Sequence, residues 1–308
     1  MRRGSTARRP VERVTVSDDG DVRRTRDDQL AVEEPLEIRV IRAEDAHLPD
    51  DSPLCEERAG RGRGRGPAHR ISVTMRTPGA DFELAAGFLY GEGLIGGAES
   101  IASIRYCTDA EQQYNVVNVR LAPGAAFDPA ALSRNFYATS SCGVCGKASI
   151  EAVMGPACAR IESRLEVDPA VLTGLPEKLR EAQHVFERTG GLHAAAQFTV
   201  DGALVRVRED VGRHNAMDKL VGSALLAGEV PLAESIVLVS GRTSFELVQK
   251  AARAGVPVLA GVSAPSSLAV ELAEQVGMTL AGFVRHPGFN VYAGGARIAR
   301  RTPQGVGG

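Results

Sequence analysis

Apolar and polar residues alternate in short runs through the first half of the chain, a pattern typical of strands with one buried face. The alternation predicts strands at residues 37–41, 71–75 and 116–121, and the first two are expected to lie side by side in a sheet or hairpin. Residues 81–90 place apolar side chains on one side at helical spacing, after a turn at 77–79, which predicts a helix.

The second half of the chain alternates regularly between predicted strands and helices. The dipeptide Asp201-Gly202 lies between two alternating runs and is a strong hairpin signal. The predicted elements are a helix at 175–188, strands at 195–200 and 203–207, a helix around 217–225, a strand at 236–239, a helix at 245–254, a strand at 256–261, a helix at 268–276 and a strand at 278–284. Such an order favours a sheet covered by helices on both faces, so we expect an α/β domain.

Two segments carry few large apolar side chains. Residues 1–29 mix Arg, Asp, Ser and Thr and are predicted to be a disordered tail, because they bury too little surface to offset the entropy of ordering. Residues 44–70 include three Arg-Gly repeats and are predicted to form a surface loop. The expected organisation is therefore a tail (1–29), a mixed α/β region (30–157) and an α/β domain (158–308).

Composition narrows the class of protein. The 308 residues are 44% hydrophobic, enough for a sizeable core, and the net charge of -2 gives no global attraction to nucleic acid. Neither a membrane-spanning apolar run nor a signal peptide is visible, so the expectation is a cytoplasmic protein without a membrane partner. Its five cysteines are then expected to stay reduced.

The most distinctive short motif is the pair Cys142 and Cys145 within residues 139–147, surrounded by glycine and serine. Small neighbours leave the sulfur atoms accessible, and helix-forming residues at 147–153 would place the thiols near a helix N-terminus, which lowers a thiol pKa. The other cysteines have no paired spacing. They are Cys55, Cys107 and Cys158.

Three chemistries compete for this cysteine pair. A structural zinc site commonly needs a second pair of ligands, which the sequence lacks, so no structural metal is predicted. A thioredoxin-like redox motif should follow an apolar strand, and residues 135–140 offer none. The third chemistry is a sulfur carrier, in which one thiolate holds a persulfide and the second assists its release by attacking the inner sulfur.

Two successive strand-to-helix junctions in the α/β half have similar sequences. Their hydroxyls, glycine and arginine suit a phosphate or pyrophosphate group; these residues are Ser240, Gly241, Arg242 and Ser263. In open α/β sheets ligands bind beyond the carboxyl ends of the strands, where helix N-termini offer free N–H groups. Serine and threonine also cap helices without any ligand, and Thr243 and Glu246 have the spacing of a capping box. Two adjacent junctions favour a ligand crevice.

Residues 209–219 form the densest polar cluster of the chain and also join a strand to a helix. The candidates in this cluster are Asp210, Arg213 and His214. A salt-bridged helix start is the structural alternative, and for a single histidine it would be preferred. The combination of acids, bases and an amide favours a site. His193, in the motif Thr189-Gly190-Gly191-Leu192-His193, is a weaker candidate.

Taken in order, five motifs resemble those of the formate dehydrogenase accessory sulfurtransferase (FdhD) family. They are SSCGVCGK, TGGLHAA, EDVGRHNA, SGRTSFELV and SAPSSLAV, and the resemblance runs from about Glu34 to Tyr292. It implies an α/β fold (α+β overall), with a C-terminal cytidine-deaminase-like three-layer α/β/α domain. A smaller N-terminal mixed domain would carry the CxxC loop.

The resemblance also implies a function. A cytoplasmic sulfurtransferase would take sulfur from a cysteine desulfurase as a persulfide on Cys142, assisted by Cys145. It would transfer that sulfur to a molybdenum bis(molybdopterin guanine dinucleotide) cofactor bound as substrate, which formate dehydrogenase then receives. The chain would be a homodimer, with the cofactor bound by the α/β domain, including Phe283, Val284, Arg285, His286, Pro287 and Gly288.

Two other functions are compared with sulfur transfer. Deaminase zinc chemistry is disfavoured, because His193-Ala194-Ala195 has no Glu at the third position and the CxxC precedes it. A non-catalytic molybdenum-cofactor chaperone, whose cysteines bind metal or a partner without moving sulfur, is the main alternative. Detection of a persulfide on Cys142 or Cys145 distinguishes the two.

Overall fold

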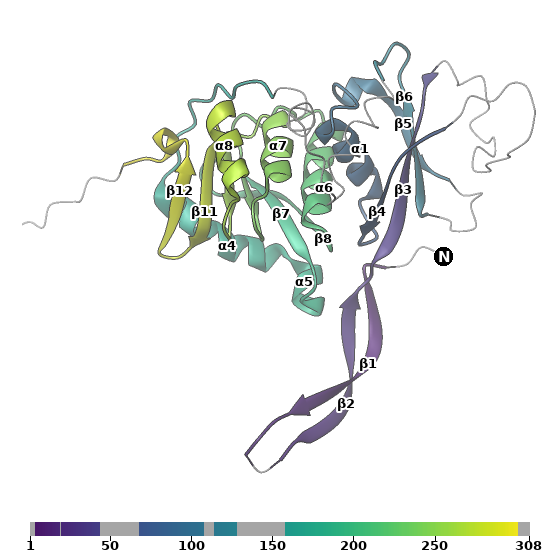
Figure 1. Cartoon of the computed structure of the whole chain (residues 1–308), viewed down its shortest axis with the longest axis vertical. Helices are drawn as coiled ribbons and strands as arrows, with labels where there is room; N and C mark the ends of the chain where they lie inside the picture. The colour runs from purple at the N-terminus through teal and green to yellow at the C-terminus, as the bar shows by residue number, and fades with distance from the viewer. Residues whose placement is uncertain (1–3, 19, 44–67, 108–113, 128–157, 301–308) are drawn as a thin grey trace, which may run out of the picture.

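The computed structural model describes residues 4–18, 20–43, 68–107, 114–127 and 158–300 (Figure 1). The CxxC loop at 139–147, the helix predicted at 147–153 and most of the Arg-Gly loop lie outside these ranges. Within them, no helix is long and apolar enough to cross a membrane.

A six-stranded mixed sheet forms the centre of the second half. Its order is β12-β11-β10-β9-β7-β8. The three central strands β9, β10 and β11 run parallel, whereas β7 is antiparallel to β9, β8 to β7, and β12 to β11. The strand bounds are β7 His193–Phe198, β8 Leu204–Asp210, β9 Ile236–Val239, β10 Val258–Gly261, β11 Thr279–Arg285 and β12 Gly288–Ala293.

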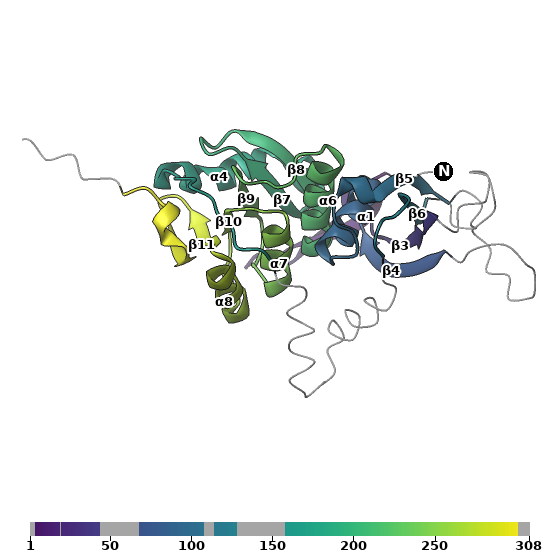
Figure 2. The same cartoon turned by 90° about the horizontal axis from the view of Figure 1, so that it is seen from above.

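Helices cover both faces of this sheet, as the strand and helix alternation predicts. On one face α4 (Pro169–Ala182) packs over β9, β11 and β12. On the other lie α6 (Arg213–Leu226), α7 (Phe245–Arg253) and α8 (Ser267–Val276). Figure 2 shows α4 on one side of the strands and α7 and α8 on the other. Each face has its own buried apolar cluster, so the sheet is the middle of three layers.

The first half contains a four-stranded sheet in the order β4-β3-β6-β5. The predicted neighbours β3 (Glu34–Ile41) and β4 (His69–Arg76) do pair antiparallel, and β6 (Val116–Leu121) has the predicted bounds. β5 (Ile101–Tyr106), after the short 3-10 helix η2 (Ala98–Ser100), was not predicted. A further 3-10 turn, η3 (Gly295–Arg297), follows β12.

A buried ion pair ties this sheet to the helix α1 (Asp81–Gly91). Arg76, at the end of β4, donates two hydrogen bonds of 3.0 Å to the carboxylate of Asp81, and both side chains are almost fully buried. The hydroxyl of Tyr106 donates to the same carboxylate at 2.9 Å. These bonds satisfy the charge at the start of α1 and fix the angle at which the chain enters the helix.

The two halves meet where α1 crosses α6. A Cβ atom on Gly87 would lie less than 3.0 Å from the backbone of Asp218, and one on Gly222 less than 3.0 Å from the backbone of Glu83. The two helix backbones therefore touch directly, which only glycine permits at both positions. One continuous apolar cluster runs across this contact from the first half into the second.

Two predictions are wrong. Instead of a disordered tail, residues 4–31 contain β1 (Thr6–Thr15) and β2 (Val22–Ala31), an antiparallel hairpin with ten paired positions. Backbone pairing orders this segment although it has no buried residue. The single helix predicted at 175–188 is two helices, α4 and α5 (His184–Thr189), because Gln183 leaves the helical conformation with ψ of 70°. The final strand β12 was not predicted.

We expect Gly87→Ala and Gly222→Ala each to lower the free energy of unfolding by about 3 kcal/mol, because a methyl group at either position forces α1 and α6 apart. Denaturant titration measures this. The control is Gly174→Ala in α4, where a new Cβ meets no atom within 4 Å, so the same change is expected to be neutral or stabilising by about 0.5–1 kcal/mol. Equal losses in all three variants would contradict the close crossing.

Candidate functional site

The residues predicted to form a ligand crevice converge on one edge of the six-stranded sheet. Since β8, β9, β10 and β11 run in the same direction, their carboxyl ends share this edge, where the antiparallel β7 and β12 begin. The predicted site residues at this edge are His193, Asp210, Ser240, Gly241, Arg242, Ser263, Phe283, Val284, Arg285, His286, Pro287 and Gly288. Junctions that are separate along the chain thus lie together at one edge of the sheet.

The turns after β9 and β10 are bonded to each other. The N–H of Thr243 donates to Ala264 O at 3.2 Å, and the N–H of Ser266 donates to Thr243 O at 3.0 Å. A Cβ on Gly261 would lie 2.6 Å from Thr243 Oγ1, so this approach requires glycine. The predicted Thr243–Glu246 capping box is wrong, because the N-cap of α7 is Ser244, whose hydroxyl bonds Glu246 Oε2 at 3.1 Å.

The segment from Phe283 to Gly288 closes the edge on the β11 side. Phe283 has φ of 53°, a rare conformation for a bulky residue, and its N–H donates to Ser263 O at 3.2 Å. Arg285 ends β11, and His286 and Pro287 connect it to β12 at Gly288. Arg242 and Arg285 are both exposed, so their guanidinium groups are available to an anion at this edge.

A cavity of about 550 Å³ opens at the edge on the α4 face of the sheet, and we name it the edge cavity. Ser240 and His193 contribute to it from the strands, and Arg180, Gln183 and Phe186 from α4, α5 and the break between them. Gln183 is 5% exposed, and its Nε2 atom has no hydrogen-bond partner among the described residues. A buried amide donor of this kind is the feature expected where a ligand supplies the missing acceptor.

His193 lies against the turn after β9. A Cβ on Gly241 would lie 3.3 Å from His193 Nδ1, and Ser240 holds the start of β7 through its Oγ, which accepts from Ala194 N at 2.8 Å. Burial lowers the pKa of His193, and the positive charge of Arg213 lowers it further. The imidazole is therefore biased toward its neutral form beside the edge cavity.

Asp210 holds the edge together from inside. Its carboxylate is fully buried, lies 2.6 Å from Lys219 Nζ and accepts hydrogen bonds from the backbone N–H of Thr77 and Gly212 and from Asn215 Nδ2. The structure therefore gives Asp210 a positioning role, joining the turn after β4 to the start of α6.

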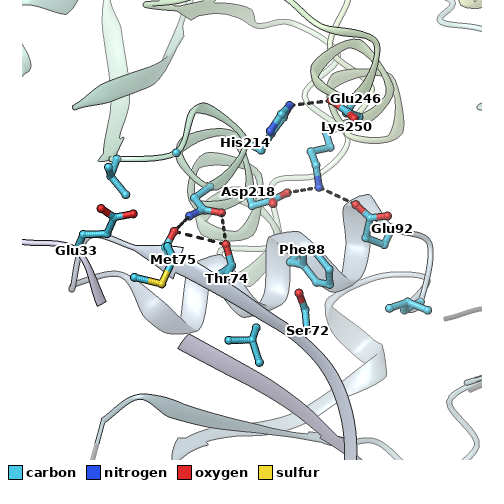
Figure 3. A pocket seen from close by; sticks show the side chains of 15 residues that line it. Glu33, Ser72, Thr74, Met75, Phe88, Glu92, His214, Asp218, Glu246 and Lys250 are labelled. Atoms are coloured by element: carbon cyan, nitrogen blue, oxygen red, sulfur yellow. Dashed lines mark hydrogen bonds and ion pairs between the residues drawn. The ribbon is translucent and has the colours of Figure 1, made fainter. Parts of the chain in front are cut away.

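A second cavity, of about 560 Å³, lies where the two halves meet, and we name it the interface cavity. Its walls are β4 and α1 on one side and α6 and α7 on the other. Figure 3 shows Lys250 pointing between the carboxylates of Asp218 and Glu92, with Phe88 beside them. The distances from Lys250 Nζ are 2.7 Å to Asp218 Oδ1 and 3.1 Å to Glu92 Oε1.

Burial strongly perturbs this charged cluster. Burial raises the pKa of Asp218 to about 6, although the charge of Lys250 opposes the rise. Burial also acts to lower the pKa of Lys250, but the carboxylates of Asp218 and Glu92 outweigh it and hold that pKa above its ordinary value. The ammonium group is thus the permanent charge of the cluster, and Asp218 is the group that titrates.

His214 faces the interface cavity, together with α7. Its Nε2 lies 2.9 Å from Glu246 Oε2 and 3.1 Å from Ser244 Oγ. The hydrogen bond from His214 lowers the pKa of Glu246 to about 2. Arg213, one residue earlier, is partly buried, and its Nε has no hydrogen-bond partner among the described residues. Arg213 and His214 were predicted to act together at the ligand crevice, but neither of them lines the edge cavity.

The sequence prediction missed Asp218, Glu92, Lys250 and Gln183. A lysine is rare in this chain, which has only four. Of the three in the described part of the chain, Lys219 is buried in an ion pair with Asp210 and Lys250 in one with Asp218. The scarcity of lysine was the sequence feature that could have marked Lys250 as a candidate. Nothing in the local pattern singles out Gln183.

Of the cysteines, two lie in the described part of the chain. Cys158 is free and half-buried, and burial raises the pKa of its thiol. Cys107 is buried. Among the described residues no group of three or more His, Cys, Asp or Glu side chains is arranged to hold a metal ion.

Comparisons with known proteins identify the family of this chain. The model of the FdhD/NarQ family matches residues 67–299, and the chain belongs to this family. Proteins named "Sulfur carrier protein FdhD" from Streptomyces avermitilis and Streptomyces coelicolor are 52% and 51% identical to it. The first match covers 96% of this chain and 97% of the relative, and the second 98% and 99%.

A solved structure has a similar fold. It is described as the crystal structure of a putative formate dehydrogenase accessory protein from Desulfotalea psychrophila. The TM-score is 0.65 at 25% sequence identity, and the match covers 95% of this chain and 99% of that one. The similarity thus includes both halves.

We expect Lys250→Met to lower the free energy of unfolding by about 3–5 kcal/mol at pH 8, because it leaves the Asp218 carboxylate buried without its cation. Without Lys250 the strongest group that opposes the effect of burial is lost, so the pKa of Asp218 rises above about 6. A carboxyl whose folded pKa is raised costs stability only above its unfolded pKa, so the deficit relative to the unmodified chain is expected to shrink at pH 5.

Denaturant titrations at the two pH values test this, with Lys178→Met on the exposed face of α4 as the control, which should change stability by less than about 1 kcal/mol. The double variant Asp218→Leu/Lys250→Met should recover part of the loss. A deficit that is independent of pH, and equal in the double variant, would show that the cluster does not act as a buried pair.

Proposed function

We propose that this protein is a sulfur carrier that sulfurates a molybdenum cofactor for formate dehydrogenase. Membership of the FdhD/NarQ family supports this, as do the names of relatives about half identical to the chain. The single observation that carries the proposal is the convergence of serine turns and exposed arginines at one sheet edge, in a chain that also holds a CxxC pair.

The sulfur chemistry falls to Cys142 and Cys145. The Cys142 thiolate attacks the terminal sulfur of a persulfide on the donor, a cysteine desulfurase, and the donor cysteine leaves as a thiolate. Cys142 then carries one additional sulfur atom as its own persulfide. Attack of Cys145 on the inner sulfur forms a Cys142–Cys145 disulfide and releases the terminal sulfur as sulfide to the molybdenum, and a cellular dithiol reduces the disulfide.

The edge of the sheet binds the substrate, the molybdenum bis(molybdopterin guanine dinucleotide) cofactor. Arg242 and Arg285 are placed to neutralise its phosphates, and the turns at Ser240 and Ser263 offer backbone N–H groups and hydroxyls. In the edge cavity, the unpartnered Nε2 of Gln183 matches a carbonyl such as that of guanine. The arrangement positions a large anionic substrate on preformed backbone.

A non-catalytic cofactor chaperone is the alternative, and mass spectrometry separates the two. After incubation with a cysteine desulfurase and cysteine, the carrier is expected to gain about 32 Da, one sulfur atom, on Cys142 or Cys145. Cys142→Ala should abolish activation of formate dehydrogenase. Cys158→Ala is the matched control and should retain it, because burial raises the pKa of Cys158 and reduces its thiolate fraction.

We expect Arg242→Ala/Arg285→Ala to weaken binding of guanosine diphosphate by at least about 10-fold, since each arginine offers a charge-assisted hydrogen bond. Titration calorimetry measures the affinity. Arg164→Ala is the control: Arg164 is exposed but lines a different cavity, beside Met278 at the amino end of β11, and should leave the affinity unchanged. If the double variant binds as tightly as the unmodified chain, the phosphates do not lie at this edge.

A further inference from the structure

The hairpin of β1 and β2 extends from the rest of the molecule as an arm, beyond α5 (Figure 1). It forms a sheet of its own, and its ten-residue strands give it a length of about 34 Å. The arm is attached at its base, where β2 packs on α5 and the N–H of Val32 donates to Ser5 O at 2.9 Å. None of its described residues is buried.

The two faces of the arm differ in charge. Opposed residues share a face, so the register places Arg9, Arg13, Arg24 and Arg26 on one face with a single acid, Asp28. We name this the basic face; four positive charges and one negative charge give it a net charge of +3. The charged residues of the other face are Arg8, Glu12, Arg23 and Asp27, whose charges cancel.

Each face of the arm contains an ion pair. On the basic face, Arg26 Nη2 lies 3.7 Å from Asp28 Oδ2. On the neutral face, Arg23 forms an ion pair of 2.9 Å with Glu12. On the basic face, Arg13 lies directly opposite Arg24, an arrangement of like charges that destabilises an isolated hairpin. No described acid forms an ion pair with either arginine. An anionic surface docked on this face would remove that repulsion.

Charged side chains on an exposed strand also prevent unwanted pairing with other strands. Charges on either face of the arm would have this effect. The asymmetry between a neutral face and a face of net charge +3 is therefore not explained by protection against aggregation. Along β1, edge pairing with another strand is also disfavoured, since Pro10 has no N–H to donate. The difference in charge makes the basic face the candidate surface for recognition.

The apolar residues of the basic face favour a protein over a nucleic acid as its partner. Val22 and Leu30 are about half exposed on this face and flank the arginines of β2, and the arm has no aromatic side chain on which a base could stack. Arginine beside exposed apolar residues is typical of protein interfaces. The net charge of -2 for the whole chain also opposes binding to nucleic acid.

We propose that the basic face of the β1–β2 arm docks on an acidic, partly apolar surface of formate dehydrogenase. This rests on the proposed function, which makes that enzyme the acceptor of the sulfurated cofactor. One face of two strands offers on the order of 300 Å², well below the roughly 800 Å² per partner of a standard interface. Such an arm accelerates and orients a transient encounter, as delivery of a cofactor requires.

The root of the arm links this docking to the body of the protein. Two residues separate β2 from β3, a central strand of the four-stranded sheet, and one of them, Glu33, lines the interface cavity. A partner that holds the arm is therefore brought to the side of the molecule where the two halves meet. In this proposal the arm makes the first contact with the partner, and the sheet edge binds the cofactor.

A charge reversal on each face tests the proposal with matched variants. Arg13→Glu/Arg24→Glu changes the basic face, and Arg8→Glu/Arg23→Glu makes the same change of four charge units on the neutral face of the same strands. Association of the full-length chain with purified formate dehydrogenase is measured by biolayer interferometry at about 50 mM and 500 mM NaCl, where screening differs strongly.

At low salt the basic-face variant is expected to associate at least about 10-fold more slowly than the unmodified chain, and the neutral-face variant within about 2-fold of it. The difference should largely disappear at high salt, and Arg13→Gln/Arg24→Gln should give an intermediate loss. Circular dichroism and the unfolding transition should be unchanged, because the arm lies outside the apolar core.

Equal losses for the two faces, a loss that salt does not reduce, or no binding of formate dehydrogenase by the unmodified chain would each overturn the proposal. So would a basic-face effect seen only on binding to duplex DNA or RNA, or only on self-association in sedimentation. The +32 Da adduct is measured in parallel on every variant. If it forms while the arm has no effect, the docking proposal fails and the sulfur carrier stands; if it never forms, the carrier fails independently of the arm.

Discussion

The direct contact between the backbones of α1 and α6 is the constraint on which the rest of the structure depends. Gly87 and Gly222 let the two helices touch, so the four-stranded and six-stranded sheets are held at one spacing. Polar bonds fix the rotation about this contact: Asn215 on α6 donates to Met75 O at 2.8 Å, and Lys219 donates to Thr77 O at 2.9 Å. Buried polar pairs add little net stability, but here they specify a single arrangement of the two halves.

This arrangement creates one of the two cavities. The interface cavity exists because α1 and β4 stand against α6 and α7, and Lys250 reaches Asp218 and Glu92 only across that junction. The edge cavity lies on the other side of the sheet, where the break at Gln183 turns α5 toward the carboxyl ends of the strands. The two cavities thus flank one sheet edge, and the turns after β9 and β10 lie between them.

Local patterns predicted the elements with strongly apolar cores. The strands at 116–121 and 236–239 have the predicted bounds, because the first alternates between buried and partly buried residues and the second is a continuous buried run. The strands β5 and β12 were missed, since both are partly exposed and their order comes from pairing with β6 and β11. The arm was mistaken for a disordered tail for the same reason: its order comes from cross-strand pairing, which composition does not report.

The amino-acid sequence by itself determined the family motifs, the α/β order of the second half and the set of residues at the strand ends, because each depends on neighbours along the chain. Only the tertiary structure decided what each residue does there. Asp210 is inside the protein among its donors, His214 faces the interface cavity with Glu246, and Lys250 is buried between two acids. These outcomes depend on groups that are distant in the sequence, and only the packing of α1 against α6 sets the distances between them.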